Sequence, residues 1–348
     1  MQIKKPVVIL TVLFFSSFAI IAALAFLSKN SHEKKNGFNR RLFNARLSPV
    51  QQVSFPATVN RLIGSCNGQL YFQGNSPYQI YTTDQTLGSL KTISLSTLPD
   101  TKLNSGVRMY LQGRHLYISC RNLPGIIDYD LDTGTPQQHT IPYFYSKEAY
   151  ILHDRFILRA NDQQSKDPLF VKLNLGNTTQ REEDHFSGKS GNSGFPTDGI
   201  LYYDSTTHQA CYTYFYRNGF ICMDTNLTVT LQARTIDTIT KIPIQIAHVG
   251  TSFTMNQPPP FVNYGGAVAA GKLFLQSMLP ADNEYALDFR ENTVIDVYSL
   301  TNGAYKGSFY IPAYNGKPLH QFHVIDKRMF AIYGKTVVQY DLNFIEDL

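Results

Sequence analysis

The sequence predicts an all-β fold, a six-bladed β-propeller, preceded by one N-terminal transmembrane helix. Three observations predict it: an apolar run near the N-terminus, an aromatic-rich composition, and a strand-and-turn pattern that recurs six times. The 348 residues include 22 Tyr and 23 Phe but no Trp. Because Tyr and Phe favour pleated, half-buried surfaces, this composition favours β structure.

The apolar run covers residues 7–27, which is long enough to span a hydrocarbon core of about 30 Å. Lys4 and Lys5 precede it, as in a signal sequence, and Ala23-Leu24-Ala25 is an acceptable cleavage site. A cleaved signal peptide is therefore the alternative. Since the run is longer than most signal-peptide apolar regions, residues 1–28 are predicted to form an uncleaved signal anchor.

The orientation of this anchor rests on two conflicting signals. Two lysines precede the helix and six Lys or Arg residues follow it within residues 29–46, which by the positive-inside rule places the body in the cytoplasm. A short basic leader at the extreme N-terminus is instead how exported proteins begin. We predict a single-pass anchor with the body in the periplasm or otherwise outside the cytoplasm. Residues 29–48 are expected to be a basic, flexible linker.

The net charge of +5 is unevenly distributed. Residues 1–46 contain eight basic residues and one acidic residue, so the rest of the chain has 23 basic and 25 acidic residues, or a net charge of −2. Nucleic-acid binding needs a concentrated basic face. The sequence of the body has no such cluster, and no nucleic-acid partner is expected.

The body contains a weak internal repeat. Its clearest copy, residues 126–134, reads as an alternating strand followed by a polar turn that ends on Gly, and residues 294–303 repeat it closely. The polar residue that ends this strand recurs six times, at Asp84, Asp130, Asn174, Asp224, Ser299 and Asp341. The intervals are 46, 44, 50, 75 and 42 residues. Apart from the long one, this is the period of a four-stranded propeller blade.

Another aromatic-aliphatic strand is expected before each copy. These strands cover residues 68–72, 114–118, 155–158, 199–203, 271–275 and 327–332. We interpret each pair as the second and third strands of a blade. The last copy leaves no room for an outer strand, so residues 50–55 are predicted to complete the final blade and close the ring. The propeller is expected to cover residues 49–348.

The long interval contains an insertion at about residues 235–263. It includes Pro258-Pro259-Pro260, which cannot lie in a central strand, so a loop across one face is expected. Long irregular loops are often functional. The candidate ligand-binding residues are the polar members of this loop, His248, Thr251, Asn256 and Gln257. The alternative is a surface loop without a site.

Two cysteines flank a turn at Arg217-Asn218-Gly219. If Asn218-Gly219 were a two-residue hairpin turn, Cys222 would lie opposite Phe215 and far from Cys211. A disulfide between the two cysteines is therefore not expected, and buried free thiols are favoured.

The blade at residues 294–300, Val-Ile-Asp-Val-Tyr-Ser-Leu, is followed by Phe-Tyr-Ile-Pro at residues 309–312. In these motifs the chain resembles exported six-bladed propellers of the TolB-like and NHL-like type, in particular an uncharacterised family of membrane-anchored bacterial propellers. The resemblance covers about residues 50–348. It implies the fold but little about function, because propellers host many unrelated activities.

No catalytic motif is present in the sequence. There is no Gly-x-Ser-x-Gly elbow, and the four cysteines have no metal-ligand spacing. His320 and His323 would point to opposite faces of a strand. No catalytic residue is therefore assigned, and no metal or cofactor is expected.

The leading functional prediction is a non-enzymatic module, tethered to the membrane, that binds a protein or peptide. The alternative is a hydrolase or lyase that acts on a sugar or lactone at the mouth of the central channel. Clustered ionisable side chains with shifted pKa values at that mouth would favour the enzyme. An aromatic, uncharged mouth covered by the insertion would favour binding.

Overall fold

The structure of the chain is a computed structural model. It describes residues 5–345 except 30–34, 46, 96–102, 104–105, 121–122, 124, 153, 163, 165–166, 177–179, 182–193, 242–243, 250–251 and 258. Helix α1 (Lys5–Lys29) contains a segment, Lys5–Leu24, that is long and apolar enough to cross a membrane. A signal sequence would meet the same criterion.

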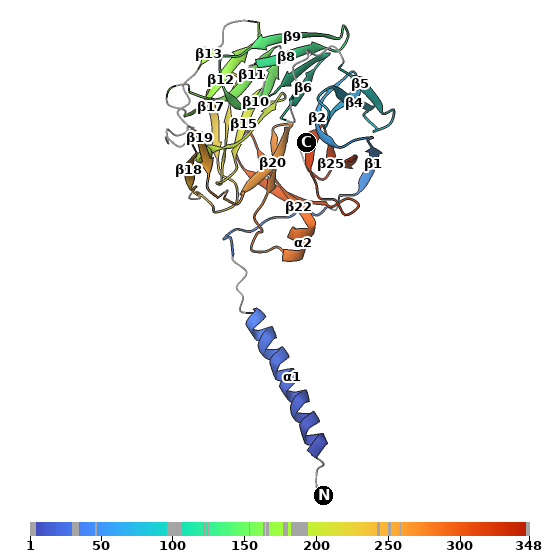
Figure 1. The fold of residues 1–348 in the computed structure, drawn as a ribbon, viewed down its shortest axis with the longest axis vertical. Coiled ribbons are helices and arrows are strands. Elements are labelled where there is room, and N and C mark those ends of the chain that lie inside the picture. The colour runs from blue at the N-terminus through green and yellow to red at the C-terminus, as the bar shows by residue number, and fades with distance from the viewer. Residues whose placement is uncertain are drawn as a thin grey trace.

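Six four-stranded antiparallel sheets follow and are arranged radially around a centre, which confirms the predicted propeller (Figure 1). Blade 1 contains β2 (Val59–Cys66), β3 (Gln69–Gly74), β4 (Gln79–Asp84) and β5 (Lys91–Ser94). Blade 2 contains β6 (Arg108–Gln112), β7 (His115–Ser119), β8 (Gly125–Asp130) and β9 (Thr135–Thr140). Blade 3 contains β10 (Tyr145–Leu152), β11 (Arg155–Asn161), β12 (Pro168–Asn174) and β13 (Gln180–Arg181).

The remaining blades have the same order, with the innermost strand first. Blade 4 contains β14 (Gly199–Asp204), β15 (Gln209–Tyr214), β16 (Phe220–Met223) and β17 (Val229–Ala233). Blade 5 contains β20 (Asn263–Ala269), β21 (Lys272–Ser277), β22 (Asn292–Ser299) and β23 (Tyr305–Pro312). Blade 6 contains β24 (Gln321–Ile325), β25 (Arg328–Tyr333), β26 (Thr336–Asp341) and β1 (Pro49–Ser54).

Strand β1 closes the ring as predicted. It pairs antiparallel with β26, from Gln51 opposite Gln339 to Ser54 opposite Thr336. The next residue, Phe55, is buried and packs on blade 1, with its ring 5.1 Å from that of Phe72 and 5.4 Å from that of Tyr81. The N-terminal strand therefore joins the last blade to the first.

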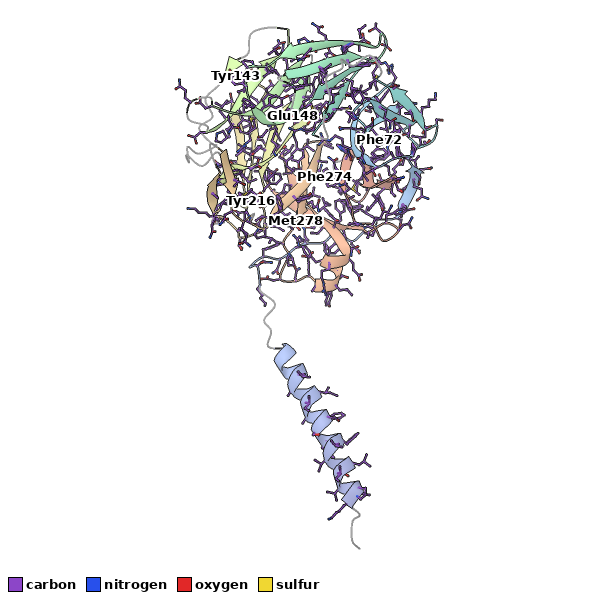
Figure 2. The ribbon with its side chains drawn as sticks, in the orientation of Figure 1. Phe72, Tyr143, Glu148, Tyr216, Phe274 and Met278 are labelled. Carbon is purple, nitrogen blue, oxygen red and sulfur yellow. The ribbon has the colours of Figure 1, made fainter. Side chains whose placement is uncertain are left out.

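Buried aromatic side chains lie within the sheets of the propeller, among them Phe72 and Phe274 (Figure 2). The largest fully buried ones are Tyr81, Tyr212, Tyr298, Tyr333, Tyr340, Phe72, Phe156, Phe220, Phe274, Phe309, Phe322 and Phe330. All lie on strands, where successive side chains point to opposite faces of a sheet that has a neighbouring blade on each side. The aromatic composition is thus a consequence of packing six sheets face to face.

The predicted strand pairs are the second and third strands in every blade except blade 4. There, residues 199–203 belong to the innermost strand, and β15 is the second. The β15–β16 hairpin has a wide loop, because the N–H groups of Phe215 and Asn218 bond outside it, to the carbonyls of Asp198 and Ile239.

This wide loop also corrects the predicted register of the two cysteines. Cys211 and Cys222 lie directly opposite each other on β15 and β16, and both are fully buried free thiols. A two-residue turn would have separated them. The two thiols therefore lie side by side on neighbouring strands.

The segment before β1 differs from a flexible linker in its second part. Residues 36–45 lie along blade 5, and Leu42 forms a parallel bridge with Ser308 of β23. Phe38 and Leu47 are buried, and so is Arg40, at 4% exposed. Tertiary contacts therefore order a stretch that is polar and basic in sequence.

The insertion between β17 and β20 contains a hairpin rather than only a loop. Strands β18 (Ile246–Val249) and β19 (Ser252–Met255) pair antiparallel, and Figure 1 places them at the rim beside β17. A second feature absent from the sequence-based prediction is helix α2 (Ala286–Glu291), which lies in the β21–β22 connection. A short 3-10 turn, η1 (Phe195–Thr197), precedes β14.

Candidate binding site in the central cavity

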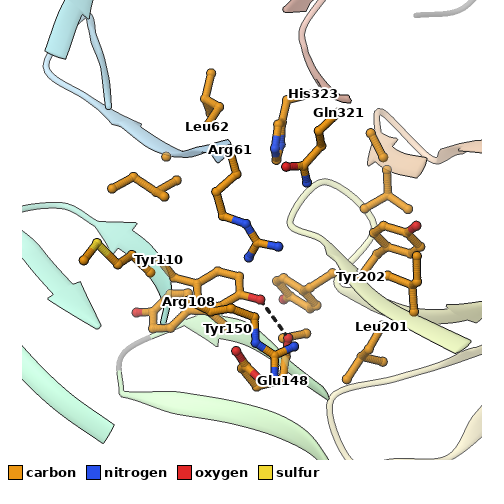
Figure 3. Close-up of a pocket in the computed structure, with 18 of the residues that line it drawn as sticks. Arg61, Leu62, Arg108, Tyr110, Glu148, Tyr150, Leu201, Tyr202, Gln321 and His323 are labelled. Carbon is orange, nitrogen blue, oxygen red and sulfur yellow. Dashed lines mark hydrogen bonds and ion pairs between the residues drawn. The ribbon is translucent and has the colours of Figure 1, made fainter. Parts of the chain in front are cut away.

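The innermost strands β2, β6, β10, β14, β20 and β24 surround a cavity of about 310 Å³. This volume is at the lower end of the range for small-ligand sites. The polar residues that line it are Arg61, Arg108, Tyr110, Lys147, Glu148, Tyr150, Tyr202, Tyr203, Gln321 and His323. Figure 3 shows that they converge from different blades. Three cations thus share the cavity with one carboxylate.

The innermost strands of the blades supply the polar side chains that reach the cavity. On β24, Gln321 and His323 line the cavity while Phe322 is buried in the core. On β6, Arg108 and Tyr110 are likewise two residues apart and line the same cavity. On β10 the consecutive residues Lys147 and Glu148 both line the cavity, because the first strand of each blade lies at the inner edge of its sheet.

Glu148 is the buried acid of the site, at 2% exposed. Its Oε2 lies 2.8 Å from Nη2 of Arg108, and its Oε1 accepts a 2.9 Å hydrogen bond from Ser119. Its main-chain oxygen accepts a 3.0 Å hydrogen bond from the Tyr110 hydroxyl. Burial raises the pKa of Glu148 above its usual value, although the charge of Arg108 opposes the shift.

Lys147, the neighbour of Glu148, lies between an acid and an aromatic ring. Its Nζ is 3.6 Å from Oδ1 of Asp198 and 5.4 Å from the ring centroid of Phe215. Burial lowers the pKa of Lys147, while Asp198 opposes that shift. Lys147 is thus a partly compensated cation at the cavity wall.

Arg61 extends from β2 into the middle of the cavity (Figure 3). Its guanidinium carbon lies 5.8 Å from the centroid of the Tyr110 ring. In the described part of the chain, no carboxylate lies within ion-pair distance of it. Arg108 and Lys147 each have a carboxylate within ion-pair distance, so Arg61 is the cation of the site without one among the described residues.

Two polar atoms near Arg61 also lack partners among the described residues. They are Nε2 of His323 and the hydroxyl of Tyr202, both buried. Burial, helped by the charge of Arg61, lowers the pKa of His323 to about 3, so its imidazole is neutral near pH 7. The cavity therefore offers a cation together with neutral hydrogen-bonding groups.

Gly266 makes room for the Tyr202 side chain. A Cβ at this position would lie 3.0 Å from the Tyr202 hydroxyl and 2.4 Å from the main-chain oxygen of Phe274. Only glycine allows β20 to approach β14 and β21 this closely.

An aromatic cluster adjoins the site on the side of Lys147. Phe261 lies 5.2 Å from Phe215, 5.3 Å from Tyr216 and 5.2 Å from Tyr264, measured between ring centroids. Phe261 ends the insertion, and Tyr264 is 48% exposed. The insertion therefore contributes an aromatic surface beside a charged cavity.

The ligand-binding residues predicted from the sequence lie elsewhere. His248 is in β18, Asn256 and Gln257 follow β19 and are exposed, and Thr251 lies outside the described residues. The cavity lining includes none of the three described residues. Their role remains a prediction, separate from the central site.

Sequence reasoning did not single out Arg61, Arg108, Lys147 or Glu148. The available signal was the presence of charged residues among core residues on the first strand of a blade. No first strand is assigned as such from the sequence, so sequence reasoning does not reach these residues. The sequence favours ordinary polar histidines at 320 and 323 over metal ligands, and in the structure His323 lines the cavity while His320 is exposed. In the described residues, no three His, Cys, Asp or Glu side chains are grouped to hold a metal ion.

Solved structures with this fold are numerous. A member of the DUF4221 family from Bacteroides vulgatus is 13% identical, with a TM-score of 0.55 over 85% of this chain and 97% of that one. A candidate exported protein from Bacteroides fragilis is 11% identical, with a TM-score of 0.49 over 85% and 94%. Virginiamycin B lyase from Staphylococcus aureus is 12% identical, with a TM-score of 0.46 over 82% and 80%.

No family model and no curated protein matches the chain. These three structures are each below 25% identical to the chain, a level of similarity that bears on the fold alone. The Bacteroides vulgatus structure, whose TM-score is above 0.5, supports this overall fold. The TolB-like and NHL-like assignment remains a prediction.

Proposed function

We propose that this chain is a membrane-tethered module that binds a protein or peptide by taking an acidic group of that partner into the central cavity. The observation that carries the proposal is Arg61, a cation in the middle of the cavity with no carboxylate partner among the described residues. An incoming carboxylate would supply that partner. The neutral His323 and Tyr202 beside it are available for further hydrogen bonds.

The balance of charges supports an acidic ligand over a basic one. Arg108 is paired with Glu148, and Lys147 has Asp198 nearby, so the three cations exceed the carboxylates that compensate them. A hydrogen bond to a charged group contributes about 1.5–3 kcal/mol, or roughly tenfold or more in affinity. The aromatic cluster around Phe261 would pack against the apolar part of the same partner.

The tether is the second part of the proposal. The length of the apolar run favours an uncleaved anchor over a cleaved signal peptide, and its short basic leader favours export of the propeller. A C-terminal alkaline phosphatase fusion tests the side of the membrane. We expect phosphatase activity in intact bacterial cells. An inactive phosphatase fusion, together with fluorescence from a matching C-terminal fusion to a reporter that fluoresces only in the cytoplasm, would contradict export.

The binding proposal is tested with an array of labelled peptides in which each Glu-containing sequence has a Gln counterpart. We expect the full-length protein to prefer the Glu members by at least about tenfold, and the Arg61→Gln variant to lose that preference. Arg155→Gln, which removes an exposed arginine from β11, is the matched control and should retain it. Equal binding of the Glu and Gln peptides would contradict the proposal.

One observation favours the enzymatic alternative, a hydrolase or lyase acting on a sugar or lactone. Glu148, Lys147 and His323 line one cavity. Burial raises the pKa of Glu148 and lowers the pKa of Lys147 and of His323, so it favours the neutral form of each group. Such a cluster is typical of sites for proton transfer. A panel of acidic sugars and lactones tests it: turnover that Glu148→Gln abolishes without loss of substrate binding would establish an enzyme.

A further inference from the structure

Helix α2 presents large apolar side chains to solvent on the rim of blade 5. Tyr285, which immediately precedes the helix, is 80% exposed, and Leu287 within it is 56% exposed. No residue of α2 is buried. The connection between β21 and β22 therefore carries an unpartnered apolar surface, made of Tyr285 and Leu287, which we call the α2 surface.

The segment that leads from the candidate anchor is bound directly to the residues before α2. The Asn36 N–H donates a 2.8 Å hydrogen bond to Asp282, and its side-chain amide donates one of 2.8 Å to the Pro280 carbonyl. Arg40 and Asn283 exchange two hydrogen bonds, of 2.9 and 2.8 Å, between main chain and side chain.

A buried ion cluster makes this attachment firm. Arg40 Nε lies 2.8 Å from Asp296 Oδ1, and its Nη1 pairs with Glu284, which itself directly precedes Tyr285. The side chains of Arg40, Glu284 and Asp296 are at most 3% exposed. The path of the chain towards the membrane is therefore fixed at blade 5, next to α2 (Figure 1).

The length of the tether limits how far blade 5 can be from the lipid. Helix α1 ends at Lys29, and seven residues later Asn36 is already bound to the propeller. Even fully extended, seven residues span at most about 25 Å. The 25 residues of α1 are about 37 Å long, more than a hydrocarbon core of about 30 Å, so Lys29 lies in the headgroup layer if α1 spans the bilayer.

We propose that blade 5 rests on the membrane and that Tyr285 and Leu287 insert into the boundary between lipid headgroups and acyl chains. This inference rests on the anchor in the proposed function. Tyr suits that boundary, because its ring is apolar and its hydroxyl is polar. The propeller then stands on its rim, and the central cavity opens along the membrane, where a neighbouring protein can reach it.

The charges on α2 indicate which lipids the α2 surface can contact. Helix α2 carries Asp288 and Glu291 against Arg290, so anionic headgroups do not attract the helix itself. The contact is apolar, and neutral phosphatidylcholine is sufficient for it.

The absence of tryptophan from the sequence allows a direct test. Leu287→Trp places a single fluorophore on the α2 surface, and Tyr285→Trp is a second, more conservative placement. The matched control is Phe144→Trp, at a position 89% exposed in the connection before blade 3, next to Tyr143 at the opposite end of the propeller (Figure 2). Each full-length variant is placed in phosphatidylcholine nanodiscs with or without brominated acyl chains.

We expect blue-shifted emission and at least about twofold bromine quenching for Leu287→Trp and Tyr285→Trp, and neither effect for Phe144→Trp. If both α2 variants emit like the Phe144→Trp control while the protein is retained in nanodiscs, the contact of the α2 surface with lipid is overturned but the anchor is not. Failure of the full-length protein to enter nanodiscs would overturn both.

Discussion

Arg108 and Glu148 connect two blades across the wall of the central cavity. Nη2 of Arg108 on β6 lies 2.8 Å from Oε2 of Glu148 on β10, and the same arginine donates a 2.9 Å hydrogen bond to the Ser146 carbonyl. Tyr110 adds a hydrogen bond to the main chain of Glu148. The polar cavity is thus also part of the contact between blades 2 and 3.

The buried Glu148 should make stability depend on pH. Because its pKa is raised in the folded protein, the folded state holds this proton over a pH range in which the unfolded state has released it. The contribution of this proton to the stability of the folded state is fully present below the pKa of the unfolded state, near 4.5. It is lost as the pH rises through the higher pKa of the folded state. Gln keeps the shape but does not titrate.

We therefore expect Glu148→Gln to gain stability relative to the parent as pH increases from 4.5 to 7, as measured by urea unfolding at each pH. Glu291→Gln, an exposed change on α2, is the control and should show no such trend. A difference between parent and Glu148→Gln that is constant with pH would contradict the predicted shift.

Arg40 should be essential for holding residues 36–45 on blade 5. Arg40→Ala leaves Glu284 and Asp296 buried without their partner, and breaking a buried ion pair in this way costs about 3–5 kcal/mol. Chemical unfolding of the full-length protein in detergent measures the loss. Arg41→Ala, an exposed neighbour, should cost less than about 1 kcal/mol. Equal losses in the two variants would show that the cluster contributes no special stability.

Phe55 should be critical for ring closure, because it packs between the final blade and blade 1. Phe55→Ala removes a buried ring from Phe72 and Tyr81, and large-to-small changes of this kind cost about 3–5 kcal/mol. Phe144→Ala, which removes an exposed ring, should change the unfolding free energy by less than about 0.5 kcal/mol. A Phe55→Ala protein that unfolds like the parent would contradict the role of this contact.

The sequence predicted the second and third strands of five blades, because those strands alternate buried aliphatic and aromatic residues and end at a polar turn. The closing strand was predicted for another reason: the last copy of the repeat lacked an outer strand. Blade 4 was misassigned because residues 199–203 read equally well as an inner or a second strand. Its wide β15–β16 loop is held by bonds to Asp198 and Ile239, outside the hairpin.

The central site could not be read from the sequence for a related reason. The inner strands carry Arg61, Arg108 and Lys147 in place of a regular apolar pattern, and register shifts interrupt both β2 and β10. Arg40 shows the same limit, because its partners are 244 and 256 residues away. In isolation it reads as a solvated linker residue, and only the assembled fold buries it.

The most direct test of the proposed acidic-partner site is photo-crosslinking in native membranes. A benzoylphenylalanine at Tyr264 places the reactive group beside the cavity, and the same residue at Phe144 is the control. We predict that mass spectrometry of the Tyr264 adduct identifies a discrete partner segment containing Asp, Glu or a C-terminal carboxylate, and that Arg61→Gln abolishes this adduct. An adduct that persists in the Arg61→Gln background, or no adduct beyond the Phe144 control, would contradict the proposed site.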